Sequence, residues 1–89
     1  MRVEHSRRVM KLKNYSGKDV RELRRKAGLN QAQFWAPFQT TQSGGSRYEA
    51  GRDIPGPVQV LLNLAFGTEA KAATILGELR GIAKTKKSS

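Results

Sequence analysis

The sequence predicts a small all-α fold of five short helices behind a short N-terminal basic arm or strand. Two observations predict it. Apolar residues recur three and four positions apart along most of the chain, which is the period of an amphipathic helix. Capping residues precede these stretches, and glycine or proline follows them. Because 89 residues suit one domain, we expect a basic arm or strand over 1–14, the helical domain over 15–82 and a basic disordered tail over 83–89.

The first expected helix covers about residues 17–26. Ser16 can cap its N-terminus, and Gly28 supplies a left-handed stop at its C-terminus. Basic residues gather in the last turn, where they suit the negative end of the helix dipole. The buried face should consist of apolar residues three and four apart, Val20, Leu23 and Ala27.

The second expected helix is short. Asn30 can cap it, it covers about residues 31–36, and Pro37 limits its length because proline cannot sit deep inside a helix. Phe38, which follows, is expected to be buried.

A third helix is expected over about 42–50, capped by Thr41 and closed by Gly51. Gly44 and Gly45 lie inside it at a cost of about 1 kcal/mol each relative to alanine. Such a helix must have a packing reason, or a need for close approach, that outweighs this cost.

Two further helices complete the expected fold. Pro57 suits the first turn of a fourth helix, which Gly67 ends, and Thr68 can cap a fifth helix over about 69–80. The apolar face of the fourth should comprise Val58, Leu61, Leu62 and Ala65. That of the fifth should comprise Ala72, Ile75, Leu76 and Leu79.

Both ends of the chain are basic. Residues 1–14 hold five basic residues against one acidic residue, and three lysines lie in the last six positions. Within this first stretch, residues 7–14 alternate well enough from Val9 onward to indicate a short strand or an extended arm. A lone strand needs a partner, for which a second copy of the chain is expected. Either end can serve as a solubilising tail or as an arm that binds a nucleic-acid backbone.

Charge and composition narrow the function. The formal net charge of +10 attracts polyanions, so nucleic acid is the default partner. The absence of cysteine excludes disulfides and thiolate metal sites, and it suits the cytoplasm. No apolar run approaches the ~18 residues of a membrane span, so no membrane partner is expected. His5 stands alone, and no nucleophile, base and orienting group assemble. We therefore expect no enzyme, no metal and no cofactor.

Two short helices joined by a tight turn make a helix-turn-helix. Residues 20–55 resemble the helix-turn-helix of Cro/C1 (Xre-type) phage and bacterial regulators. The matching pieces are Leu23-Arg24, Gly28-Leu29-Asn30-Gln31, Thr40-Thr41-Gln42-Ser43 and Arg47-Tyr48-Glu49-Ala50-Gly51-Arg52, followed by Pro55. The resemblance implies a five-helix, lambda-repressor-like helix-turn-helix domain.

The resemblance also implies roles for individual side chains. Those expected to contact base edges open the recognition helix or follow one turn later, and they are Gln42, Ser43, Ser46 and Arg47. Those expected to contact the DNA backbone are Gln31, Thr41 and Arg52. The chemistry fits, because glutamine can bond bidentately to adenine and arginine to guanine, while serine is undiscriminating.

Other positions are expected to be structural. Arg24 and Glu49 match a pair that orients the recognition helix in relatives. Trp35 stands where relatives keep a small residue, and Gly45 where they place a branched apolar one. We expect a volume swap in which a buried indole fills the space beside Gly45. Gln39 stands at a turn position where glycine is common, which puts the geometry of that turn in question.

The sequence therefore predicts a sequence-specific double-stranded DNA-binding transcriptional regulator, most simply a repressor of its own promoter. One motif covers few base pairs, so a homodimer on an inverted repeat is expected, with half-site centres about 34 Å or multiples apart. Dimer contacts would come from residues 7–14, from the fifth helix, or from both. The residues concerned in that helix are Ile75, Leu76, Leu79 and Ile82. By analogy with the family, the protein would regulate a phage or mobile element, as the anti-CRISPR-associated regulators do.

Two alternatives remain open. An antitoxin would keep the fold and bind both its operator and a toxin partner through a second, apolar surface. A non-specific nucleic-acid-binding protein would instead rely mainly on its basic arms.

Overall fold

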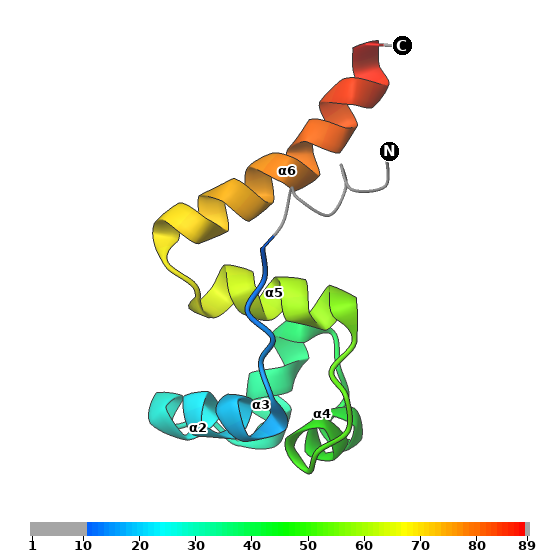
Figure 1. The fold of residues 1–89 in the computed structure, drawn as a ribbon. Coiled ribbons are helices and arrows are strands. Elements are labelled where there is room, and N and C mark those ends of the chain that lie inside the picture. Colours follow the sequence, from blue (N-terminus) through cyan, green and yellow to red (C-terminus); the bar gives the residue numbers. More distant parts are fainter. Residues whose placement is uncertain (1–10, 89) are drawn as a thin grey trace. The chain divides into compact units, whose positions relative to one another are not determined.

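The computed structural model describes residues 11–88, with side chains to residue 82. These residues are predominantly helical and include no strand, which confirms the all-α prediction (Figure 1). They form two compact units, of which one is residues 14–59 and the other joins the segment up to residue 13 with the segment from residue 60 onward. The elements are α2 (Gly17–Ala27), α3 (Gln31–Trp35), the 3-10 helix η1 (Ala36–Phe38), α4 (Gln42–Glu49), α5 (Gly56–Phe66) and α6 (Glu69–Ser88).

Helix α2 begins and ends where the sequence predicts. The Ser16 hydroxyl accepts a hydrogen bond from the backbone N–H of Asp19 at 3.1 Å, and the Asp19 carboxylate accepts one from the Ser16 N–H at 3.0 Å. This capping box satisfies two amides at the helix start. Gly28, with φ 75°, ends the helix in the left-handed region. Its buried face is narrower than predicted, because Val20 is buried whereas Ala27, the last helical residue, is exposed.

The start of α2 lies directly against the end of α4. A Cβ atom on Gly17 would overlap the carbonyl oxygen of Tyr48 and crowd the backbone of Glu49. A residue without a side chain is therefore required at this crossing, which sets how closely α2 and α4 approach each other.

The tight turn between α3 and α4 lies at Gln39, the position where the sequence puts its geometry in question, and a 3-10 helix precedes it. Pro37 lies within η1, and the chain reverses at Gln39, whose φ of 58° is the one positive value at a non-glycine residue among residues 11–88. Phe38 is half-buried rather than buried. Its ring centroid lies 5.3 Å from that of Phe34 and 5.8 Å from that of Trp35.

Helix α4 is capped as predicted. The Thr41 hydroxyl oxygen accepts a hydrogen bond from the Gly44 N–H at 3.0 Å. The helix ends at Glu49, and Gly51 follows with φ 125°. Because Gly45 is buried on this helix, its missing side chain lies on the inward face.

Helix α5 presents a different inner face from the one predicted. Leu62 is buried, but Leu61 and Ala65 are exposed, and the polar residues Gln59 and Asn63 are buried in their place. Burial of an amide is tolerated when its hydrogen bonds are made. These two amides have such partners in the backbone.

Each amide pairs with both backbone groups of one residue. In the unit formed by residues 14–59, Gln59 accepts from the Tyr15 N–H at 2.9 Å and donates to the Tyr15 carbonyl at 2.8 Å. In the other unit, Asn63 does the same with Lys13, at 2.9 Å and 2.9 Å. Side-chain amides of α5 thus bond the backbone of Lys13 and Tyr15. Residues 11–14 form no strand, and residues 7–10 lie outside the described part.

Helix α6 is longer than predicted. Thr68 caps it by accepting from the Lys71 N–H at 3.1 Å, as expected, but the helix continues to Ser88. The prediction of a disordered tail from residue 83 is therefore wrong for residues 83–88, and residue 89 lies outside the description. Alanine and lysine favour helix, and lysines near a C-terminus suit the helix dipole. Among the described helices, none combines the length and apolar character needed to cross a membrane.

Candidate nucleic-acid interface

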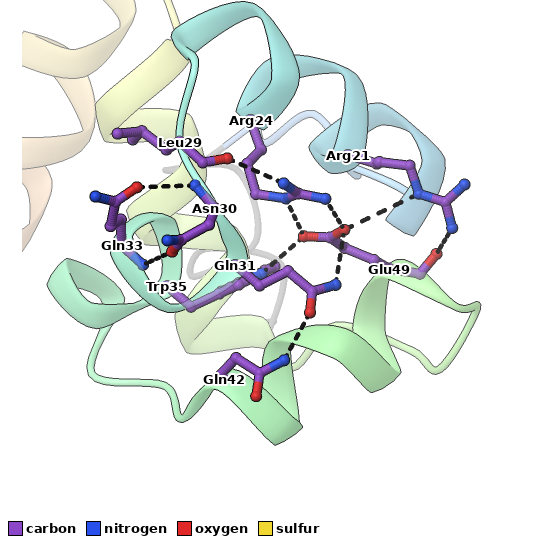
Figure 2. Close-up of polar contacts among 9 residues, drawn as sticks. All are labelled: Arg21, Arg24, Leu29, Asn30, Gln31, Gln33, Trp35, Gln42 and Glu49. Atoms are coloured by element: carbon purple, nitrogen blue, oxygen red, sulfur yellow. Dashed lines mark hydrogen bonds and ion pairs between the residues drawn. The ribbon is translucent and has the colours of Figure 1, made fainter.

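A buried carboxylate, that of Glu49 at the end of α4, lies at the centre of the helix-turn-helix (Figure 2). Its side chain is 2% exposed. Arg24 on α2 donates from Nε to Oε2 at 2.9 Å and from Nη2 to Oε1 at 2.9 Å. This two-point geometry is the strong form of an arginine–carboxylate pair. The predicted pairing of Arg24 with Glu49 is confirmed.

Two further donors reach the same carboxylate from α3. The indole N–H of Trp35 donates to Oε2 at 3.0 Å, and the Gln31 amide donates from Nε2 to Oε1 at 3.2 Å. Each carboxylate oxygen of Glu49 therefore accepts two hydrogen bonds, which uses its acceptor capacity. A buried charge is tolerated when it is paired and bonded in this way.

The environment of Glu49 changes its acidity. Burial raises the pKa of Glu49, but hydrogen bonds from Arg24, Trp35 and Gln31, together with the Arg24 charge, lower it by more, so the net pKa lies below its ordinary value. The hydrogen bond to Glu49 raises the pKa of Arg24. Both groups are therefore charged at neutral pH. The ion pair joins α2 to α4, and hydrogen bonds from Gln31 and Trp35 join α3 to the same carboxylate.

The hydrogen-bonded chain continues to the first residue of α4. Gln42 donates from Nε2 to Oε1 of Gln31 at 2.7 Å, so the two glutamines that open α3 and α4 are linked (Figure 2). Sequence reasoning assigned both to DNA and missed the bond between them. The available signal was that each glutamine is the first residue of one of the two helices of the motif.

The indole of Trp35 also explains the glycine on α4. Trp35 is completely buried, and a Cβ atom on Gly45 would overlap its five-membered ring. The predicted burial of the indole beside Gly45 is confirmed. The indole is held edge-on to Phe34, with centroids 5.2 Å apart, and 5.6 Å from the ring of Tyr48.

The residues expected to contact bases lie on one helix. Gln42, Ser43 and Arg47 are exposed, and Ser46 is half-buried. Positions 42, 43, 46 and 47 fall within one face at helical spacing. Thr41 and Arg52, which bracket α4, are also exposed.

Residues 21–65 match the family model described as the RsaL-like HTH domain. The match covers just over half of the chain. The chain belongs to the RsaL-like helix-turn-helix family. It is thus a DNA-binding regulator with a helix-turn-helix of the Xre/Cro type, in agreement with the resemblance in its sequence. Neither the curated proteins nor the solved structures gave a significant match.

The RsaL-like match includes the whole of α3, η1 and α4. Every side chain of the Glu49 network and every expected DNA contact lies inside it. Helix α6 lies outside, so the family does not account for its exposed apolar residues.

Proposed function

We propose that this RsaL-like protein is a transcriptional repressor that binds an inverted-repeat operator as a homodimer, with α4 in the major groove. The observation that carries the proposal is the exposure of Gln42, Ser43 and Arg47 on one face of α4. Their side chains supply the donors and acceptors that read base edges. In this proposal the protein binds DNA and catalyses no reaction. It acts in the cytoplasm, where its DNA would be.

Arg47 is our first choice for sequence discrimination. Within the described part of the chain no ion pair engages its guanidinium, so its paired donors are available to guanine O6 and N7. Ser43 and Ser46 complete the base-reading face. Such bidentate contacts contribute ~1–3 kcal/mol of discrimination each.

Three side chains are proposed to contact phosphates. Thr41 uses its oxygen to cap α4, which leaves its hydroxyl hydrogen for a phosphate. Gln31 commits one Nε2 hydrogen to Glu49 and retains the other. Arg52 lies exposed after α4 and supplies a charge. Contacts of this kind fix the register of the protein on the duplex.

The homodimer is proposed to form through α6. Leu76, Leu79 and Ile82 are exposed at helical spacing on this helix, beside the buried Ile75. Both acidic residues of α6 lie in its first ten positions, and four of its five basic residues lie in the remainder. Antiparallel pairing of two α6 helices would oppose these charges, whereas parallel pairing would place the basic ends together. Residues 7–14 are a second candidate for dimer contacts.

The proposal is tested with DNA directly. Wild-type protein is used to select duplexes from a pool with a randomised core, and the selected sequence is sought and footprinted upstream of the protein's own gene. We expect a protected inverted repeat at the promoter. If an unrelated duplex displaces the selected one at equal concentration, the protein binds non-specifically, as its charge of +10 alone would allow, and the proposal fails.

An antitoxin is the second candidate, because the exposed apolar residues of α6 could instead hold another protein. The measurement that separates the two is the mass of the purified protein in solution. A homodimer sediments at twice the mass of the chain and needs no other component to protect the operator. A stoichiometric small protein that co-purifies through α6 would favour the antitoxin.

A further inference from the structure

A cleft of about 700 Å³ opens between the start of α2 and the segment that follows α4. The residues that line it all belong to the unit formed by residues 14–59, which also contains the helix-turn-helix. Pockets that hold small molecules typically enclose about 300–1,000 Å³. The cleft is therefore large enough for a small molecule, and the proposed DNA contacts do not account for it.

The buried residues of this cleft are already bonded within the protein. The amide of Gln59 pairs with the backbone of Tyr15, and the carboxylate of Glu49 pairs with Arg24. Glu49 therefore adds no uncompensated charge to the cleft. Recognition of a ligand must come from the exposed side chains that line the same cleft.

Two basic side chains and one acidic side chain make up this exposed part. Lys18 is the second residue of α2, and Arg52 and Asp53 follow α4. All three are exposed, and none of their side chains forms a hydrogen bond or an ion pair in the part of the chain that the structure describes. The cleft thus has an excess of one positive charge, and its two cations come from different elements.

This arrangement favours a ligand that carries a phosphate group. The guanidinium of arginine matches the geometry of phosphate oxygens, and a lysine ammonium supplies a second point charge. Because Asp53 repels an anion, the phosphate should lie between Lys18 and Arg52. Asp53 is then left to accept hydrogen bonds from hydroxyl groups on the rest of the molecule. The chemistry fits a small phosphate ester that bears hydroxyl groups.

We propose that this cleft binds a small phosphate ester between Lys18 and Arg52, and that the bound molecule weakens the affinity of the protein for DNA. Arg52 is the link between the two ligands. When its side chain turns into the cleft it is withdrawn from the DNA backbone, and the charge of the bound ester repels nearby DNA phosphates. This effect on DNA rests on the proposed function, whereas binding of the ester does not.

Binding is tested first with inorganic phosphate and the full-length protein. Amide resonances are followed by NMR while phosphate replaces chloride at constant pH and ionic strength. We expect saturable shifts at Gly17, Lys18 and Arg52, which disappear in Lys18→Gln. The matched control is Lys26→Gln, the same change at an exposed position of α2 outside the cleft, and it should bind phosphate as the wild type does. Shifts that Lys18→Gln leaves unchanged would overturn the site.

Glycerol 3-phosphate then tests the role of Asp53, because it adds two hydroxyl groups to the same phosphate. We expect it to bind about 3-fold or more tightly than inorganic phosphate, through hydrogen bonds to the carboxylate. In Asp53→Ala the ratio of the two dissociation constants should fall toward unity. A ratio that is the same in the wild type and in Asp53→Ala would overturn the role of Asp53.

The effect on DNA is measured with the selected duplex at constant ionic strength. If the two ligands exclude each other, glycerol 3-phosphate at twice its own dissociation constant should raise the dissociation constant for DNA by about 3-fold. Lys18→Gln should bind the duplex as the wild type does and show no such rise. An unchanged DNA affinity in the wild type would overturn the regulatory part of the proposal.

Two further outcomes separate this inference from the proposed function. If free phosphate does not bind and Lys18→Gln instead makes the salt dependence of DNA binding shallower by about 0.9, the cleft holds a phosphate of the DNA backbone, and the inference of a small-molecule site is wrong. If no duplex is selected, the proposed function fails, while the NMR titration still decides whether the cleft binds phosphate.

Discussion

At the residue scale, Trp35 serves two purposes within the helix-turn-helix. Its ring fills the volume beside Gly45, and its N–H donates to the carboxylate of Glu49. A small residue at position 35 would do neither. Because one side chain both packs the motif and bonds its charged centre, a change at Gly45 should affect the polar network as well as the packing.

The first prediction concerns Gly45→Ala. Alanine stabilises a helix by about 1 kcal/mol relative to glycine. At position 45, however, its methyl group would overlap the buried indole of Trp35. Overpacking of a tight interior costs typically about 1–3 kcal/mol, so we expect a net loss in the free energy of unfolding. Urea denaturation followed by circular dichroism measures it. The matched control is Gly77→Ala on α6, where nothing lies within 4 Å of the added atom, and there the same change should stabilise by up to about 1 kcal/mol. Equal effects at both positions would contradict the steric account.

The second prediction concerns pH and Glu49. The pKa of Glu49 is lower in the folded chain than its ordinary value of 4.5, so the unfolded chain takes up the proton first as the pH falls. The stabilisation is complete above pH 4.5 and is lost as the pH drops through the lower folded-state pKa. Glu49→Gln should therefore be less stable than the wild type at pH 7, and the difference should shrink in acid.

Unfolding free energies from pH 7 down to pH 3 provide the measurement for Glu49→Gln. Glu22→Gln is the control, because Glu22 is an exposed acid on α2 outside the Glu49 network. At pH 7 this control should lie within about 0.5 kcal/mol of the wild type. A difference between Glu49→Gln and the wild type that stays constant over this range would show that the Glu49 charge is not linked to folding.

At the element scale, the side-chain amides of Gln59 and Asn63 on α5 hold the backbone of Tyr15 and Lys13. Gln59→Leu would keep the volume of the side chain but leave the N–H and carbonyl of Tyr15 without their partner on α5. A buried polar group left unsatisfied costs about 1–3 kcal/mol, so we expect a loss in the free energy of unfolding of that order or more. Faster hydrogen exchange at the Tyr15 amide would locate the effect. An unchanged exchange rate at Tyr15 would show that water or another group replaces Gln59.

At the same scale, the sequence located the ends of the helices better than the inner face of α5. Caps and stops predicted α2 and α4 well, because Ser16, Gly28 and Thr41 act through local hydrogen bonds and backbone preference. The inner face of α5 was mispredicted because the partners of Gln59 lie far away in sequence, at a separation of 44 residues. Two amides four residues apart that interrupt an apolar stripe were the available signal.

In the candidate site, too, some contacts could be predicted from the sequence and others could not. The resemblance to the Cro/C1 regulators implied the pairing of Arg24 with Glu49, and the departure of Trp35 and Gly45 from that family in volume predicted the burial of Trp35. The link from Gln31 to Gln42 did not, because exposed amides have many possible partners. The end of α6 was missed because Lys84, Lys86 and Lys87 are typical of both tails and helix ends.

At the scale of the whole molecule, the proposed dimer leads to a fourth prediction. Leu76→Glu with Ile82→Glu places charges on exposed positions of α6, where the folded chain should tolerate them. We expect sedimentation to show a monomer in place of the wild-type dimer. Affinity for the inverted repeat should fall, because the two half-sites no longer act together. Binding to a duplex that carries one half-site should stay unchanged, and loss of that binding as well would show that the substitutions damage the DNA-binding unit instead.

The last prediction concerns where the net charge of +10 acts. If the first residues bind phosphates, changing Arg7 and Arg8 to glutamine leaves fewer phosphates neutralised and fewer counterions released. The slope of log affinity against log salt should then become shallower by about 0.9 for each phosphate that is no longer neutralised, with base preference unchanged. Arg25→Gln with Lys26→Gln is the matched control, because it lowers the net charge by the same amount at exposed positions on α2. Titrations at several salt concentrations compare the two variants. Equal slopes would mean that residues 7 and 8 act only through total charge, and that the specific phosphate contacts come from the other proposed residues, Gln31, Thr41 and Arg52.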